Sequence, residues 1–188
     1  VELLTTFDEE QAAAIAKEIN ATNAQRQGLV NEIYEMAVQI AKDEQHRDQQ
    51  TLVISGHDWH QGVLGIVASR LVELTNKPTI VLSDQNHDGL YKGSGRSVAA
   101  LNLFEALNPA REQFEGFGGH HMAIGITVKE DKLPVLAAQL EKAAEQVQLD
   151  FRQRPQLKLD ATVAINELST DLVAKIKQLG PFGMDNPV

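Results

Sequence analysis

The sequence predicts an α/β fold in which a mixed sheet with flanking helices follows a long connector helix and precedes a second domain. Three observations predict it. Apolar residues recur at three- and four-residue steps from residue 8 to about residue 46, which is typical of a long helix. Residues 51–55 and 79–83 are short β-rich runs, and the segment 63–74 between them has helical spacing. A strand, a helix and a second strand in this order predict a parallel βαβ unit.

The other elements follow from local signals. Asp8 is a suitable N-cap for the first helix, whereas the polar residues 20–23 are expected to bend or break it. The further elements expected are a strand at 90–95, short helices around 101–107 that are broken by Pro109, a strand at 122–128, an amphipathic helix at 131–147, a half-exposed strand at 157–165 and a helix at 169–179. We therefore divide the chain into a helical connector at 1–50, an α/β domain at 51–150 and part of another domain at 151–188.

Composition narrows the class of protein. Of the 188 residues 43% are hydrophobic, which is enough for a core, and cysteine is absent, which excludes disulfides and thiolate metal sites. No apolar run has the length of a membrane span and the N-terminus does not resemble a signal peptide, so we expect a cytoplasmic protein. The chain opens with Val1 rather than Met and stops just after a turn-like segment, so we interpret it as an excerpt of a longer protein.

The charge is unevenly distributed. A net charge of −9 argues against a protein coated for non-specific DNA binding. The acidic residues lie mostly in the predicted helices, whereas residues 51–100 carry 4 acidic and 4 basic residues. This balance allows a local pocket for an anion but no broad basic face.

Three glycine-rich segments, at residues 56–70, 92–97 and 116–125, carry the residues best suited to bind a ligand. Each combines glycine with Ser, Arg or His at a predicted boundary between strand and helix. Glycine lets a backbone approach a ligand closely, while Arg, Ser and His supply hydrogen-bond donors. Such a set suits a bound phosphate. The three segments therefore predict a site that grips an anionic substrate, and nucleic acid is the class that we favour.

The first two segments each allow two interpretations. His60 and Gly62 lie in a loop before a predicted helix, where backbone N–H groups and the helix dipole favour an anion. The structural alternative is a tight turn anchored by Trp59. Ser94 and Arg96 are two residues apart on an extended chain, so they share one face and form a suitable phosphate clamp. The alternative there is a glycine-rich edge strand with a solvated arginine.

The third segment places Gly118, Gly119 and His120 at a turn from which the imidazole donates to a phosphate. A metal site with His121 is disfavoured because adjacent histidines rarely bind one ion and no carboxylate cluster lies nearby in the sequence. A capping or core histidine is the structural alternative. The sequence shows no cluster with two-metal spacing, no Ser-His-Asp order and no GK[ST] phosphate loop. We therefore expect binding residues, and neither catalytic residues nor a metal site.

Taken together, the three segments resemble the DHH-associated domain in the C-terminal part of the RecJ exonucleases, a family within the DHH phosphoesterase superfamily. The resemblance rests on HQGVLGIVASRL at residues 60–71, KGSGRS at 92–97 and GFGGHHMAIG at 116–125. The tail at 179–188 is similar to the opening portion of RecJ's oligonucleotide-binding-fold domain. On this resemblance, residues 151–188 belong to a partial oligonucleotide-binding (OB-like) domain.

The resemblance implies the substrate-binding fragment of a 5′→3′ single-stranded-DNA exonuclease, with roles in DNA repair and recombination. Hydrolysis is implied for an N-terminal DHH domain, joined in cis and holding two Mn²⁺ or Mg²⁺ ions, so the fragment alone is expected to be inactive. Ser94 and Arg96 match family residues that contact phosphate of the DNA strand, and His120 matches the histidine of the Gly-Gly-His turn. Two positions depart from the family pattern: Ile124, where Ala is usual, and His121, where Lys is common.

Three alternatives stay open on the sequence. A DHH hydrolase acting on short oligoribonucleotides, nucleotide phosphates or cyclic dinucleotides is generally compact and lacks the added oligonucleotide-binding domain. A non-catalytic RNA-binding module would resemble the tail of alanyl-tRNA synthetase. A scaffold would use the long helix to bind a partner protein.

Overall fold

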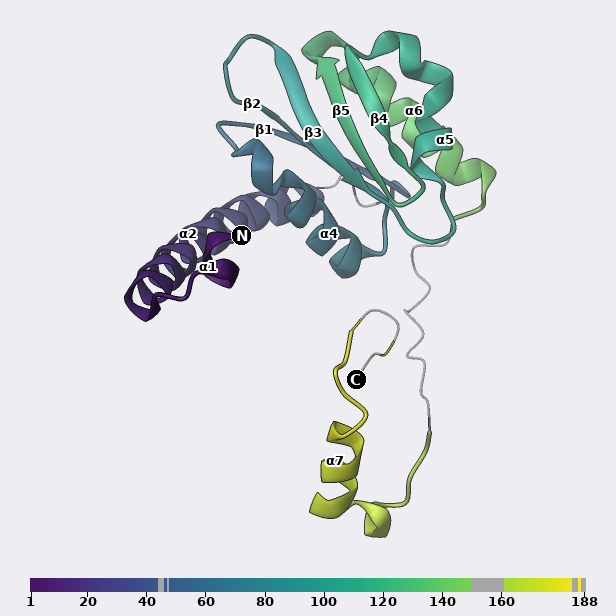
Figure 1. Ribbon diagram of the computed structural model, residues 1–188. Coiled ribbons are helices and arrows are strands. Elements are labelled where there is room, and N and C mark those ends of the chain that lie inside the picture. Colours follow the sequence, from purple (N-terminus) through teal and green to yellow (C-terminus); the bar gives the residue numbers. More distant parts are fainter. Residues whose placement is uncertain (44–45, 47, 150–160, 184–185, 187–188) are drawn as a thin grey trace. The chain divides into compact units, whose positions relative to one another are not determined.

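The computed structural model describes the chain except for residues 44–45, 47, 150–160, 184–185 and 187–188, and it divides into two compact units, Val1–Arg154 and Pro155–Val188 (Figure 1). Within the described residues, no helix is both long enough and apolar enough to cross a membrane.

The first unit opens with a short helix, α1 (Glu2–Thr5), and the long helix α2 (Glu9–Ala41). Asp8 caps α2 as predicted, because its carboxylate accepts the backbone N–H groups of residues 10 and 11 at 2.9 and 3.1 Å. Helix α2 runs through residues 20–23 without the expected break. The segment holds neither Pro nor Gly, and the side-chain oxygen of Asn23 accepts from Arg26 at 2.8 Å rather than competing for the backbone. The helix ends at Ala41, earlier than the sequence pattern indicates.

A five-stranded mixed sheet follows, with the strand order β1-β2-β3-β5-β4. The parallel βαβ unit is confirmed: β1 (Leu52–His57) and β2 (Thr79–Asp84) pair in parallel and are joined through η1 (Gln61–Val63) and α4 (Leu64–Thr75). The remaining strands, β3 (Leu90–Arg96), β4 (Gly116–His120) and β5 (Ala123–Lys129), pair antiparallel. The expected α/β class with a mixed sheet is therefore confirmed.

Strand β4 corrects the prediction of a turn at the Gly-Gly-His segment. All five residues of β4, from 116 to 120, pair with β5. Only the two residues between His120 and Ala123 form the turn that joins the two strands. Glycine has a low strand propensity, so a sequence pattern cannot show such a strand. The pairing arises from the register with β5, which is a long-range effect.

The helices after β3 are α5 (Leu103–Leu107), η2 (Asn108–Gln113), η3 (Glu130–Lys132) and α6 (Leu133–Gln146). The α-helix α5 ends at Leu107, two residues before Pro109, and the break expected at Pro109 is a change to the 3₁₀ helix η2. Proline is accommodated in the first turn of η2, where no backbone donor is required. In the second unit, η4 (Ile165–Glu167) precedes α7 (Thr170–Lys177), which is capped by Ser169. Of the strand expected at 157–165, residues 157–160 lie outside the described residues, and 161–165 contain no strand.

Two hydrophobic cores lie on opposite faces of the sheet. On one face α4 packs on β2 and β3, and α2 packs on α4 and β1. On the other face α5 packs on β4 and β5, and α6 packs on α5 and reaches β1 (Figure 1). The first core contains Val30, Ile33, Leu52, Ile54, Leu64, Val67, Leu71 and Val81, and the second contains Ile80, Leu82, Leu103, Leu107, Ile124, Ile126, Leu136 and Leu140. Within the first unit, α4 reaches only as far as β3, so no helix of this unit covers the first face over β5 and β4.

Candidate functional site

The open face of β3, β5 and β4 carries the predicted Ser/Arg segment. Lys92, Ser94 and Arg96 alternate along β3 with glycines 93 and 95, so their side chains leave the same face of the sheet. Three rows of paired residues cross the strands: Lys92–Thr127–Gly116, Ser94–Gly125–Gly118 and Arg96–Ala123–His120. The register therefore places Arg96 of the second glycine-rich segment and His120 of the third at the same end of this face.

Ser94 and Arg96 are in direct contact. The Arg96 Nη1 group donates to Ser94 Oγ at 2.7 Å and to the Gly95 carbonyl at 2.7 Å, and Ser94 Oγ donates to the Ile124 carbonyl at 3.2 Å. Both side chains are half-buried. The Ser94 hydroxyl thus orients a guanidinium whose remaining N–H groups can bind an anion in a bidentate geometry.

Helix α4 supports this pair from one side. A Cβ atom added at Gly65, the second residue of α4, would lie 2.6 Å from Arg96 Nη2 and 3.1 Å from Ser94 Oγ. No side chain fits there without moving the guanidinium. Gly65, in the first glycine-rich segment, therefore lets helix α4 lie close to the Ser94–Arg96 pair. The sequence pattern alone did not assign this role to Gly65.

Two glycines on the open face are not explained by packing. A Cβ atom added at Gly118 or Gly125, which are paired with each other across β4 and β5, would meet nothing within 4 Å. By contrast, a side chain at Gly95 would meet Ile124 and Leu103, and Gly119 has a φ of +147° that disfavours other residues. Gly95 and Gly119 are therefore needed by the fold, whereas Gly118 and Gly125 leave a flat floor beside Ser94.

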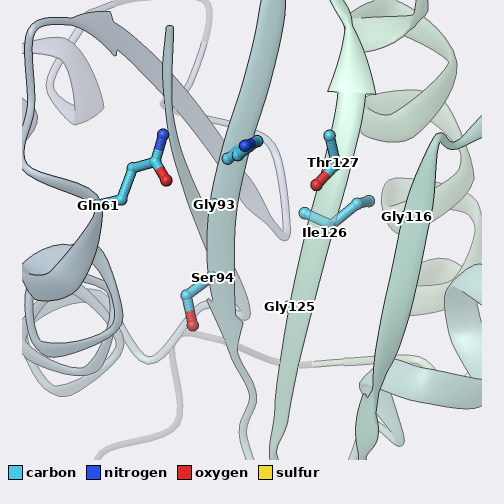
Figure 2. Close-up of a pocket in the computed structure, with 8 residues that line it drawn as sticks. Gln61, Gly93, Ser94, Gly116, Gly125, Ile126 and Thr127 are labelled. Carbon is cyan, nitrogen blue, oxygen red and sulfur yellow. The ribbon is translucent and has the colours of Figure 1, made fainter. Parts of the chain in front are cut away.

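A cavity of about 340 Å³ opens over this floor (Figure 2). Its lining consists of Gln61, Lys92, Gly93, Ser94, Gly116, Gly125, Ile126 and Thr127. Figure 2 shows Gln61 on one side of β3 and Thr127 on β5 at the other. Sequence reasoning missed Gln61, Lys92 and Thr127 as lining residues. The alternation that singled out Ser94 and Arg96 extends to Lys92 and could have found it.

His60 and Gly62 lie elsewhere. The His60 Nδ1 atom accepts the Gly62 N–H at 3.1 Å, which caps η1. Both residues line a separate cavity of about 330 Å³ together with Thr22, Gln25, Arg26, Leu29 and Val63. The structure therefore does not bring them together with Ser94 and Arg96, and their contact with phosphate stays a prediction.

Trp59 anchors the loop that precedes η1. Its indole ring covers Gly56, where a Cβ atom would overlap the ring, and its backbone N–H donates to Ser83 Oγ at 3.0 Å. Asp58 has a φ of +60° and its carboxylate lies 2.9 Å from His87 Nε2. These contacts fix the loop and so position Gln61 at the cavity.

His120 shares its row with Arg96 but lies two strands away, about 9–10 Å between Cα positions at normal strand spacing. Its side chain is exposed, and no hydrogen bond joins it to Ser94 or Arg96 within the described part of the chain. The adjacent His121 places Nε2 3.2 Å from the Ala99 carbonyl. Convergence of all three predicted residues on one phosphate therefore stays a prediction.

The turn between β2 and β3 is held by Asp84. Burial raises the pKa of this carboxyl, but backbone N–H groups outweigh that effect and hold the pKa below its ordinary value of 3.8. The donors are Gly89 at 2.9 Å and Asp88 at 3.2 Å. The ionised carboxylate thus fixes the start of β3, the strand that carries Ser94 and Arg96.

Comparison with known families decides the class of this chain, because residues 48–146 match the DHHA1 domain. The chain belongs to the DHHA1 domain family. Its relatives include single-stranded-DNA-specific RecJ exonucleases. The chain is 35% identical to RecJ of Bacillus subtilis (strain 168) over 187 residues, and 29% identical to RecJ of Escherichia coli (strain K12) over 184 residues. These alignments cover 100% and 94% of this chain but 24% and 32% of the relatives.

Solved structures agree with this DHHA1 assignment. The structure of RecJ in complex with Mg²⁺ from Thermus thermophilus is similar with a TM-score of 0.79 at 30% identity, over 99% of this chain and 28% of that one. An exonuclease RecJ bound to manganese is similar with a TM-score of 0.64 at 32% identity, over 77% of this chain and 35% of that one. The predicted resemblance to part of RecJ is confirmed, and the chain spans about a quarter to a third of these relatives.

Among the described residues, no group of three or more His, Cys, Asp or Glu side chains could hold a metal ion. The described side chains therefore do not fit the Mg²⁺ or manganese of the similar structures.

Proposed function

We propose that this chain is the substrate-binding region of a RecJ-like single-stranded-DNA exonuclease, and that the phosphate backbone of the strand lies on the open face of β3, β5 and β4. The observation that carries the proposal is the Ser94–Arg96 pair beside the floor of Gly118 and Gly125. A fixed guanidinium offers paired donors to a phosphate, and a floor without side chains lets the strand approach the sheet.

Further predicted contacts complete the proposed site. His120 and Gly119 lie at the same end of the face as Arg96 and would contact the strand there. His60 and Gly62, beside the cavity at α2, would contact it at a separate point. Because phosphate contacts carry no base information, the grip is independent of sequence. This fits an enzyme that must degrade any strand.

Hydrolysis is assigned to a domain outside these residues. We propose that an N-terminal DHH domain, joined in cis, holds two Mn²⁺ or Mg²⁺ ions and cleaves the strand that this region presents. In support, the similar RecJ structures contain Mg²⁺ or manganese. On this proposal residues 1–50 are the connector, 51–150 the substrate-binding domain and 151–188 part of an OB-like domain. The 188-residue chain alone is inactive, and its proposed location is the cytoplasm, where the DNA is.

Binding of labelled oligonucleotides to the 188-residue chain tests the proposed phosphate contacts. We expect single-stranded DNA of mixed sequence to bind, and Arg96→Ala and Ser94→Ala to weaken binding without a change in melting temperature. Arg111→Ala is the matched control, because Arg111 is exposed in η2, which packs against α5 and α6. Equal affinity of wild type and Arg96→Ala would refute the proposed face. Stronger binding of RNA than of DNA would favour an oligoribonuclease or an RNA-binding module instead.

A further inference from the structure

We propose that Lys92, Thr127 and Gln61 form a second phosphate subsite, one phosphate along the strand from the Ser94–Arg96 pair. The proposal rests on the proposed function, since it needs a nucleic-acid strand on the same face. It gives a role to Lys92 and Gln61, which lie inside the motif segments but had none, adds Thr127 from outside them, and gives the strand a defined path along β3.

The path follows from the spacing of β3. Alternate residues on an antiparallel strand lie about 6.8 Å apart, so Lys92 and Ser94 leave the same face at that separation. This is comparable with the separation of successive phosphates in an extended single strand. Thr127 is the direct partner of Lys92 on β5, and the cavity of about 340 Å³ is continuous from Ser94 to both of them.

The chemistry of the lining suits an anion. Lys92 is exposed, and none of the ion pairs between described residues involves it. Lys129 on β5 is different, because its ammonium lies 3.0 Å from a Glu115 carboxylate oxygen, and this contact raises the pKa of Lys129. The Thr127 hydroxyl and the Gln61 amide add neutral donors on either side of β3, the strand that carries Lys92 (Figure 2).

The surface next to Lys92 and Thr127 is formed by backbone and small side chains. Gly125, beside Thr127 on β5, has open space above it, and the nearest atom to an added Cβ at Gly116 is Thr127 Oγ1 at 3.3 Å. A phosphate between Lys92 and Thr127 therefore meets backbone and small groups. This arrangement continues the floor that lies beside Ser94.

The acidic end of the face limits the length of the path. Beyond Lys92, a neighbouring cavity is lined by the carboxylates Asp88, Glu115, Glu130 and Asp131, with Lys129 among them. A third phosphate in that direction would meet this negative charge. We infer that the strand leaves the sheet after Lys92, so this face holds two successive phosphates between Arg96 and Lys92.

The test compares two ligands on the 188-residue chain: fluorescein-labelled dT12, measured by anisotropy, and thymidine monophosphate, measured by NMR titration. We expect Lys92→Gln to weaken dT12 binding about 3- to 10-fold and to weaken thymidine monophosphate binding less, because a ligand with one phosphate does not need both subsites, whereas Arg96→Ala should weaken both ligands. The slope of log affinity against log salt should fall by about 0.7, the value for one phosphate of a single strand. Thr127→Val, which keeps the side-chain shape, should weaken dT12 about 2-fold.

Two controls separate the possible failures. Lys142→Gln removes the same charge from a position on α6, on the opposite face, and should leave dT12 affinity unchanged. If Arg96→Ala weakens both ligands while Lys92→Gln alters neither dT12 affinity nor the salt slope, the second subsite is refuted and the proposed function stands. If wild type does not bind dT12, or Arg96→Ala binds it normally, the proposed function itself fails. A melting temperature unchanged in Lys92→Gln confirms that any loss is local.

Discussion

Replacing Gly65 by alanine should separate binding from folding. The added methyl group would lie 2.6 Å from Arg96 Nη2, so the guanidinium must move away from Ser94. The atom displaced is the end of a flexible side chain, and therefore the fold can accommodate the change. Alanine also favours helix α4 over glycine by about 0.5–1 kcal/mol. We expect the melting temperature to hold or to rise by about 1–4 °C.

The expected effect of Gly65→Ala is a weaker affinity for single-stranded DNA. Hydrogen bonds to charged groups contribute about 1.5–3 kcal/mol, and a displaced Arg96 keeps its charge but loses its fixed geometry. A loss near the lower limit corresponds to about a 10-fold weaker affinity for single-stranded DNA. The assay is anisotropy of a labelled strand titrated with wild type and Gly65→Ala, with thermal melts of both proteins.

Gly28→Ala is the matched control. Gly28 lies on the exposed side of α2, and an added Cβ there meets nothing within 4 Å. It should raise helix stability in the same way and leave affinity unchanged. Wild-type affinity in Gly65→Ala, or a parallel fall of affinity and melting temperature, would show that the approach of α4 does not position Arg96 for binding.

Three further outcomes are expected. Arg96→Ala should weaken single-strand binding about 10- to 100-fold whatever the base sequence. Arg96→Lys should recover only part of the lost affinity, because an ammonium cannot bind phosphate in a bidentate geometry. Titrations with two unrelated sequences would expose a base preference if one exists. Gly118→Ala and Gly125→Ala should melt close to wild type, since each methyl group enters open space, yet bind single strands more weakly; normal binding by both would mean that no strand lies on the floor. The pKa of Asp84 is lower in the folded state, so its stabilising contribution is complete above the ordinary value of 3.8 and is lost as the pH falls through the folded-state pKa. Wild type should therefore lose stability in this acid range relative to Asp84→Asn. Parallel curves of stability against pH for the two proteins would contradict this.

The sequence alone determined the elements that depend on neighbouring residues. Asp8 caps α2 through contacts two and three residues away, and the βαβ unit follows from two apolar runs around a helical pattern. It also placed Ser94 and Arg96 on one face, because alternation along a strand is a local property. Composition and spacing sufficed for these features since each reports burial or hydrogen bonding within a few residues.

Only the tertiary structure decided how the segments meet. Strand β4 forms because Gly116–His120 pairs with β5, and a glycine-rich run has no local signal for that pairing. The approach of Gly65 to Arg96, and the meeting of Gln61, Lys92 and Thr127 around one cavity, depend on strand register and on where α4 lies on the sheet. His60 and Gly62 belong to the same segment as Gln61 but face α2, because one turn of η1 directs neighbouring residues to different surfaces. Such contacts join residues far apart in the sequence, and their geometry is set by packing of the whole unit rather than by any one segment.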